Sequence, residues 1–133
     1  MKIILDTNVL IAALIARGTC HELLEHCAVR HDLYTSDFIL NELQEKLIEK
    51  FDYSPELAAE AVGVVRSGMT VANAQKLERA VCRDPDDDNI LAAAIAGSCD
   101  CIITDDKDVL VLKTYEGVEI FSPHEFLINE RNN

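Results

Sequence analysis

Four carboxylates stand where the chain is expected to end a strand or to begin a helix. They are Asp6, Glu42, Asp88 and Asp106. If the fold gathers them, two like charges about 4 Å apart repel by roughly 1 kcal/mol in water and by about 4 kcal/mol at an effective dielectric of about 20. Protons or a divalent cation would relieve this repulsion. Because oxygen ligands favour Mg²⁺ or Mn²⁺ over zinc or copper, we expect a metal-dependent enzyme that acts on phosphate esters.

Each of these acids also has a simpler interpretation when it is taken alone. Asp6 follows an apolar run and is a good helix N-cap. Glu42 lies within a helical pattern and can be an exposed surface charge. Only the combination of all four acids, each near an expected strand end or helix start, favours the catalytic interpretation.

The segment 84–88 is rich in aspartate, so its members have to be separated. We interpret Asp84 and Asp87 as residues of a solvated turn, and Asp86 as a helix cap. Asp88 is chosen as the site residue because it directly precedes the apolar helix pattern that begins at 90.

Polar neighbours of these acids are candidates for supporting roles. The hydroxyls of Thr7 and Thr104 and the amide of Asn8 can orient carboxylates. Asp108 is an auxiliary ligand or the cap of a short turn. Lys107 either contacts a substrate phosphate or screens the neighbouring negative charges.

The order of the expected elements indicates an α/β fold. Apolar runs predict strands, and apolar residues at helical spacing predict helices. This alternation is typical of a three-layer α/β/α architecture with a central parallel sheet, and ligands bind at the carboxyl ends of such strands. Residues 73–83 fit either a helical turn or a covering loop. We expect strands at 2–5, 33–35, 69–72, 101–104 and 118–121, and helices at 9–16, 19–31, 36–50, 54–68, 86–96 and 122–128, the fifth capped by Asp86 or Asp87.

Size and charge narrow the class of protein further. The 133 residues fit one domain that spans 1–133, and 49% hydrophobic residues suffice for an ordinary core. A net charge of -12 argues against a generic nucleic-acid coat but not against a nuclease with a local cation. Candidate cations near the motifs are Arg17, Lys46, Lys50, Arg83 and Lys107.

Targeting features favour a cytoplasmic protein with no membrane association. Asp6 interrupts the first apolar run, so no secretory signal is expected, and the longest apolar stretch, 9–16, is too short to span a bilayer. The odd number of cysteines, 5, also suits a reducing compartment. Zinc is not favoured at the nearby Cys20, His21, His26 and Cys27, because on a helix the two histidines diverge from the face that the cysteines share.

The four acidic segments, in this order, resemble the PIN domain, the nuclease module named after the PilT N-terminus. They are Ile4-Leu5-Asp6-Thr7-Asn8, Asn41-Glu42-Leu43, Asp88-Asn89-Ile90-Leu91-Ala92 and Ile103-Thr104-Asp105-Asp106. The resemblance covers nearly the whole chain. It implies an endoribonuclease that depends on Mg²⁺ or Mn²⁺, with Asp6, Glu42, Asp88 and Asp106 as metal ligands and catalytic residues.

The same resemblance implies partners. Many small single-domain members are toxins of type II toxin–antitoxin pairs, of which the VapC type is the best known. We therefore expect an RNA substrate, an antitoxin protein that covers the site, and a homodimer. Helices at 19–31 and 54–68 have apolar character that can support such a dimer.

Two other functions are kept as alternatives. A haloacid-dehalogenase-like phosphatase or phosphoacceptor domain would use Asp6 as a nucleophile, although such enzymes usually place a second acid where this chain has Asn8. A non-catalytic binding module would use its acids for stability alone.

Overall fold

The structure is a computed structural model that describes residues 1–132. Within that range, six strands form one sheet in the order β3-β2-β1-β4-β6-β5. All neighbouring strands are parallel except β5 and β6, which are antiparallel. The strands are β1 (Lys2–Leu5), β2 (Asp32–Ser36), β3 (Thr70–Ala72), β4 (Cys101–Ile103), β5 (Thr114–Tyr115) and β6 (Val118–Phe121).

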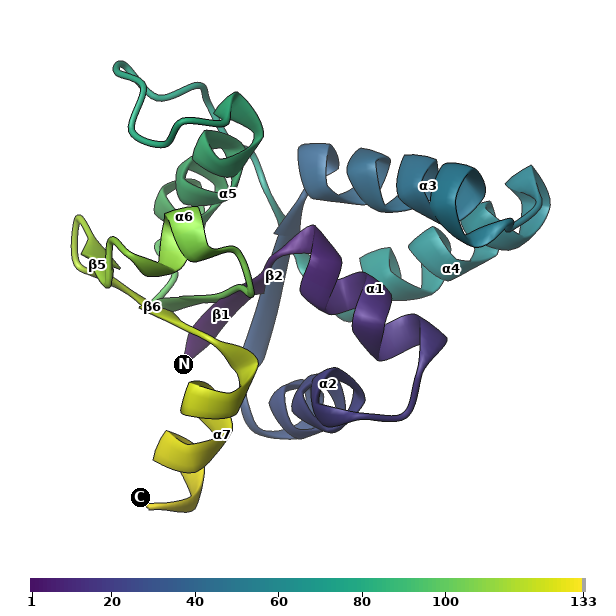
Figure 1. The fold of residues 1–133 in the computed structure, drawn as a ribbon, viewed down its shortest axis with the longest axis horizontal. Helices are drawn as coiled ribbons and strands as arrows, with labels where there is room; N and C mark the ends of the chain where they lie inside the picture. Colours follow the sequence, from purple (N-terminus) through teal and green to yellow (C-terminus); the bar gives the residue numbers. More distant parts are fainter. Residues whose placement is uncertain (133) are drawn as a thin grey trace.

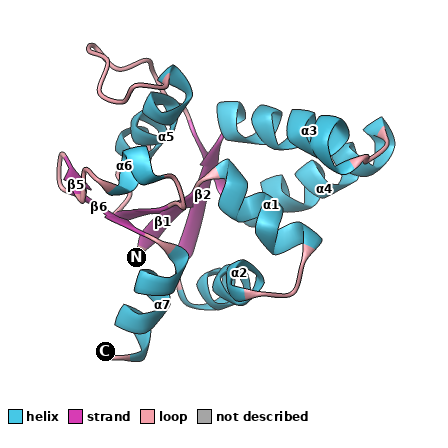
Figure 2. Ribbon diagram, viewed as in Figure 1, coloured by secondary structure: helices cyan, strands magenta, loops and turns pink. Residues whose placement is uncertain are grey.

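Helices cover both faces of this sheet, which confirms the three-layer α/β/α prediction (Figures 1 and 2). In Figure 1, α1 to α4 lie on one side of the central strands and α5 lies on the other. The C-terminal helix α7 contacts α2 and β6. The helices are α1 (Thr7–Ile15), α2 (Thr19–Arg30), α3 (Asp37–Phe51), α4 (Pro55–Gly68), α5 (Pro85–Ala96), α6 (Lys107–Leu110) and α7 (Pro123–Arg131).

The two central strands position the first and last acids of the sequence pattern. Ile3, Ile4 and Leu5 are fully buried, as expected for a parallel strand covered on both faces. Leu5 of β1 pairs with Ile103 of β4. The next residue on each strand, Asp6 or Thr104, therefore emerges at the same edge of the sheet.

The predicted elements are confirmed with small shifts of their ends, and three details differ. The cap of α5 is Asp84, whose side chain accepts a hydrogen bond from the Asp86 N–H at 2.9 Å, so the prediction of Asp86 or Asp87 as the cap was wrong. Pro85 takes the first helical position, where its missing N–H costs nothing. The short elements α6 and β5 were not predicted, because four and two residues are too few for a periodic pattern.

Residues 73–84 form neither helix nor strand and connect β3 to α5. The loop interpretation of this segment is therefore correct. Among the described residues, no helix combines the length and the apolar character that crossing a membrane requires.

Candidate metal centre

Asp6 is the most firmly held acid of the sheet edge. It is the N-cap of α1 and only 7% exposed. Its Oδ1 accepts a hydrogen bond from the Thr7 N–H, and its Oδ2 accepts one from the Thr104 hydroxyl, both at 2.6 Å. Burial raises the pKa of Asp6, the two hydrogen bonds oppose this, and the charges of Glu42 and Asp106 raise it further. The carboxylate is thus oriented by two donors and surrounded by negative charge.

Thr104 links Asp6 to the second strand-end acid. The threonine is fully buried, and its Oγ1 also accepts a hydrogen bond from the Asp106 N–H at 3.0 Å. Asp106 caps α6 by accepting a hydrogen bond from the Asp108 N–H at 2.9 Å. One hydroxyl therefore orients the side chain of Asp6 and the backbone of Asp106 together.

Asp87 supplies the acid of α5 that faces this edge. Its side chain is buried at 8% exposure, and one of its carboxylate oxygens lies within 4.8 Å of one from Asp106 and one from Asp108. Burial, followed by the charge of Asp106 and a hydrogen bond to it, raises the pKa of Asp87 to about 7, with smaller contributions from Asp84 and Asp6. The interpretation of Asp87 as a residue of a solvated turn was therefore wrong.

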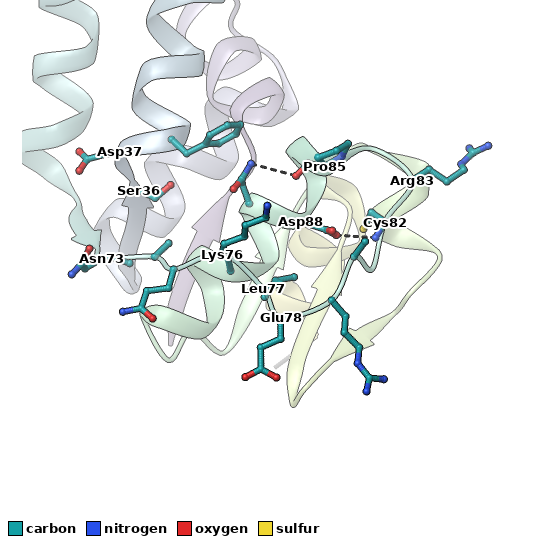
Figure 3. Close-up of a pocket in the computed structure, with 18 residues that line it drawn as sticks. Ser36, Asp37, Asn73, Lys76, Leu77, Glu78, Cys82, Arg83, Pro85 and Asp88 are labelled. Carbon is teal, nitrogen blue, oxygen red and sulfur yellow. Dashed lines mark hydrogen bonds between the residues drawn. The ribbon is translucent and has the colours of Figure 1, made fainter.

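Asp88, the residue chosen from sequence, points to the loop instead. Its Oδ1 accepts a hydrogen bond from the Cys82 N–H at 2.8 Å (Figure 3). Its Oδ2 accepts one from the Val81 N–H at 3.0 Å. Consecutive residues on a helix point about 100° apart, so Asp87 and Asp88 leave α5 in different directions. Asp87 therefore lies among the three carboxylates at ligand spacing, whereas Asp88 is bonded to the loop; the role of Asp88 as a metal ligand stays a prediction.

Glu42 approaches the cluster from α3. Ile39, Leu43 and Leu47 bury one face of this helix, and the neighbouring Glu42 side chain is left only 17% exposed. Its carboxylate lies close enough to Asp6 to raise the pKa of that residue. Lys46, one turn later, has its Nζ 3.9 Å from Glu42 Oε1. Glu42 therefore carries a partly compensated charge at the margin of the cluster.

The supporting residues divide into those that touch the acids and those that do not. The Asn8 side chain is bonded to Lys46 rather than to a carboxylate: its Oδ1 accepts a hydrogen bond from Lys46 Nζ at 3.2 Å. Thr7 acts on Asp6 through its backbone, while its buried hydroxyl has no hydrogen-bond partner among the described residues. Asp108 accepts a hydrogen bond from Arg83 at 2.8 Å. Lys107 is exposed at the start of α6.

The donor set fits a hard divalent cation. Asp87, Asp106 and Asp108 offer carboxylate oxygens at ligand spacing, and Asp6 is close enough for its charge to raise the pKa of Asp87. Oxygen ligands of this kind suit Mg²⁺ or Mn²⁺. Burial is the main cause of the raised pKa values of Asp6 and Asp87, and the charges of neighbouring acids in the cluster add to it. A bound cation would supply the missing positive charge.

A cavity of about 750 Å³ lies between the loop 73–83, the start of α3 and α5, and Asp88 is one of its lining residues. Figure 3 shows Asp88 pointing from α5 toward Cys82 of this loop, and Arg83 extending away from the helix. Lys76, Arg79 and Arg83 are among the lining residues. The loop that Asp88 anchors thus brings three cations to an otherwise acidic region.

Comparison with known proteins identifies the family. A sequence profile of the PIN domain matches residues 2–108. The chain belongs to the PIN domain family. A search of curated proteins found no match to the sequence.

Solved structures share the fold of this PIN domain at low sequence identity. VapBC-1 from nontypeable Haemophilus influenzae has a TM-score of 0.67 and 15% identity, over 93% of this chain and 99% of that one. VapBC2 from Rickettsia felis, bound to a DNA fragment from its promoter, has a TM-score of 0.63 and 16% identity, over 90% and 97%. VapC20 from Mycobacterium tuberculosis, a toxin that cleaves the sarcin-ricin loop, has a TM-score of 0.59 and 18% identity, over 86% and 97%.

Proposed function

We propose that this PIN domain is a metal-dependent endoribonuclease and the toxin of a VapC-like toxin–antitoxin pair. The observation that carries this proposal is the gathering of Asp6, Asp87 and Asp106 at the carboxyl edge of the two central strands. Acids from three separate segments converge there, and their mutual repulsion favours a bound cation. One domain, spanning 1–133, would carry the whole activity.

The proposed ligands are Asp6, Asp87 and Asp106, with Asp108 and Glu42 at the margin. A divalent cation held there would lower the pKa of a water molecule and offset the charge that develops on the phosphate. Thr104 keeps the Asp6 carboxylate in a fixed orientation. The Glu42 carboxylate lies close enough to Asp6 to raise the pKa of that residue. It can therefore accept a hydrogen bond from the attacking water molecule and orient it.

The loop side of the cavity is the proposed RNA path. Lys76, Arg79 and Arg83 line it, and cations of this kind bind phosphates without reading sequence. Arg83 connects this path to the cluster through its hydrogen bond with Asp108. Contacts of this type would offset the negative net charge of -12 as the RNA backbone approaches.

The partner proposals rest on the fold neighbours and on exposed apolar residues. Two of the similar structures are VapBC complexes, so we propose an antitoxin that covers the acidic site with an arginine or lysine. Val29 of α2 is 85% exposed, and Val64 of α4 is 70% exposed, which suits burial in a homodimer. The cytoplasm is the proposed compartment, since the five cysteines are unbridged in the structure.

The phosphatase alternative has no support from the geometry. Asn8 stands where such enzymes usually carry their second acid, and its Oδ1 accepts a hydrogen bond from Lys46 Nζ, so that acid is missing here. The binding-module alternative would keep the same acids in place without cleaving RNA, so the cleavage assay separates it from the nuclease.

The test is cleavage of a mixed-sequence fluorescent RNA by purified tag-free protein, with Mg²⁺, Mn²⁺ or EDTA. Asp6→Asn preserves an oxygen that can cap α1 but removes the charge. Asp105→Ala removes a neighbouring exposed carboxylate and serves as the matched control. We expect cleavage that requires metal, persists in Asp105→Ala and disappears in Asp6→Asn.

Two results would contradict the proposal. Full activity of Asp6→Asn would exclude the carboxylate site as the source of cleavage. Absence of cleavage by the wild type, together with no rise of its melting temperature in Mg²⁺ or Mn²⁺, would favour a binding module instead.

A further inference from the structure

A second cluster of possible metal ligands joins α2 to α7, outside the carboxylate site. His26 lies on α2, His31 directly follows it, and Glu130 lies near the end of α7. The Nε2 atom of His26 is 2.8 Å from Glu130 Oε1, and the Nε2 atom of His31 also contacts that oxygen. Three donor atoms of different chemistry thus converge within 4.8 Å of one another.

The surroundings hold these side chains in place while leaving the cluster accessible. The side chains of His26, His31 and Glu130 are 27%, 11% and 16% exposed. The edge of the His31 ring meets Phe126, with ring centroids 5.9 Å apart, and the His31 Nδ1 is 3.1 Å from the Met1 nitrogen. The three residues line a surface cavity of about 560 Å³, so an ion and a water molecule can enter.

The donor chemistry differs from that of the catalytic candidate. Two imidazole nitrogens and one carboxylate oxygen form a ligand set that zinc binds, with a fourth position left open for water. Imidazole suits Zn²⁺, Co²⁺ and Ni²⁺, whereas Mg²⁺ prefers oxygen ligands alone. Hydrogen bonds from His31 and His26 hold the pKa of Glu130 below its usual value, so this carboxylate is available as an anionic ligand.

We propose that His26, His31 and Glu130 form a second cation site, selective for Zn²⁺-like ions, that fastens α7 to α2. An ion held there would replace the two hydrogen bonds to Glu130 Oε1, so the imidazole and carboxylate groups would separate slightly to admit it. Because the ligands come from segments 99 and 104 residues apart, binding would stabilise the packing of the C-terminal helix.

The test uses Co²⁺ as a spectroscopic probe on tag-free wild-type protein in excess Mg²⁺, which on the proposed function would fill the carboxylate cluster. We expect visible d–d absorption bands at one Co²⁺ per chain, and their loss when Zn²⁺ is added. His26→Gln and Glu130→Gln should each weaken Co²⁺ binding by more than about 100-fold, since loss of a ligand exceeds the 10–100-fold effect of losing a residue that only orients one. Asp87→Asn, which alters the carboxylate cluster, should leave the bands unchanged.

Two controls keep the result interpretable. Far-UV circular dichroism and a cooperative thermal unfolding transition show whether each variant is folded, and the two glutamine variants lie on different helices. The proposal is overturned if the wild type gives no Co²⁺ bands. The three side chains would then only join α7 to α2 by hydrogen bonds. The proposal is also overturned if the bands survive both glutamine variants or disappear in Asp87→Asn.

Discussion

Substitution of Asp87 and substitution of the neighbouring Asp88 should have opposite effects on stability and on the response to Mg²⁺. Comparing the two variants therefore tests the geometry of the site directly. Each is changed to asparagine, which preserves size and removes one negative charge. Asp87 lies in the carboxylate cluster, whereas Asp88 accepts hydrogen bonds from two loop N–H groups. The two variants are therefore matched in sequence position and chemistry, and they differ only in what the side chain contacts.

The expected change in the free energy of unfolding for Asp87→Asn follows from the raised pKa of Asp87. Burial, followed by the charge of Asp106, raises the pKa of Asp87 from 3.8 to about 7, so the ionised side chain weakens the folded state at pH 8. At about 1.4 kcal/mol for each pKa unit, the upper value of this cost is roughly 4 kcal/mol. Without metal, Asp87→Asn should therefore be more stable than the wild type. With saturating Mg²⁺, it should lose the stabilisation of about 2.7 kcal/mol that a ligand at 100 times its Kd provides.

Asp88→Asn should have the opposite effects: it should lower stability and keep the response to Mg²⁺. The asparagine can accept only through its single oxygen, so one of the Val81 and Cys82 N–H groups loses its acceptor. The loss of a charged acceptor should cost about 1–3 kcal/mol with or without metal. The rise of the melting temperature in Mg²⁺ should remain, because the cluster of Asp87, Asp106 and Asp108 is intact.

The assay is thermal and urea unfolding of both variants at pH 8, in EDTA and in Mg²⁺. The site geometry would be refuted if Asp88→Asn abolished the response to Mg²⁺ while Asp87→Asn kept it. That result would restore Asp88, the residue favoured by sequence, as the metal ligand.

Three further outcomes follow from the same contacts. In EDTA, the wild type should lose stability as pH rises from about 4 to about 7, because the folded state binds the Asp87 proton more tightly than the unfolded state does. The midpoints of urea unfolding across this pH range measure the loss, and in Asp87→Asn the midpoint should depend less on pH. Thr104→Ala should cost about 1–3 kcal/mol and reduce RNA cleavage, because Asp6 loses its hydroxyl donor; Thr104→Ser should restore both, and an inactive Thr104→Ser would contradict this role. Leu43→Ala should destabilise by about 2–5 kcal/mol in urea unfolding, since its side chain is fully buried on α3; a change under 1 kcal/mol would show that this helix face is not packed as described.

Local sequence pattern determined most of the fold. The apolar run at 2–5 can be stable only when it is covered on both sides, and the alternation of strands and helices then requires parallel pairing through crossovers. The positions of Asp6 and Asp106 followed directly, because both come after strands that end at the same edge. The short elements α6 and β5 were not predicted because two to four residues carry no periodicity. They depend on tertiary contacts with β6: β5 pairs with it and α6 packs against it.

The sequence could not distinguish the aspartates of segment 84–88. All of them are adjacent, acidic and close to the start of α5, so composition and spacing are nearly the same for each. The distinction depends on the direction in which each side chain leaves the helix, and one residue changes that direction by about 100°. A signal was present in Pro85, which favours the first helical position and therefore places the cap at Asp84 and sets the rotation of the residues that follow.

By itself, the sequence determined an α/β chain with acids at the ends of its strands and the starts of its helices, since hydrophobic periodicity and capping preferences are local properties. Only the tertiary structure decided which acids share a site, which one anchors the loop, and that His26 and His31 meet Glu130. These pairings join residues up to 104 positions apart, and no local property encodes which distant partner a side chain will face. The packing of helices against the sheet fixes those directions, and with them the chemistry that each side chain can perform.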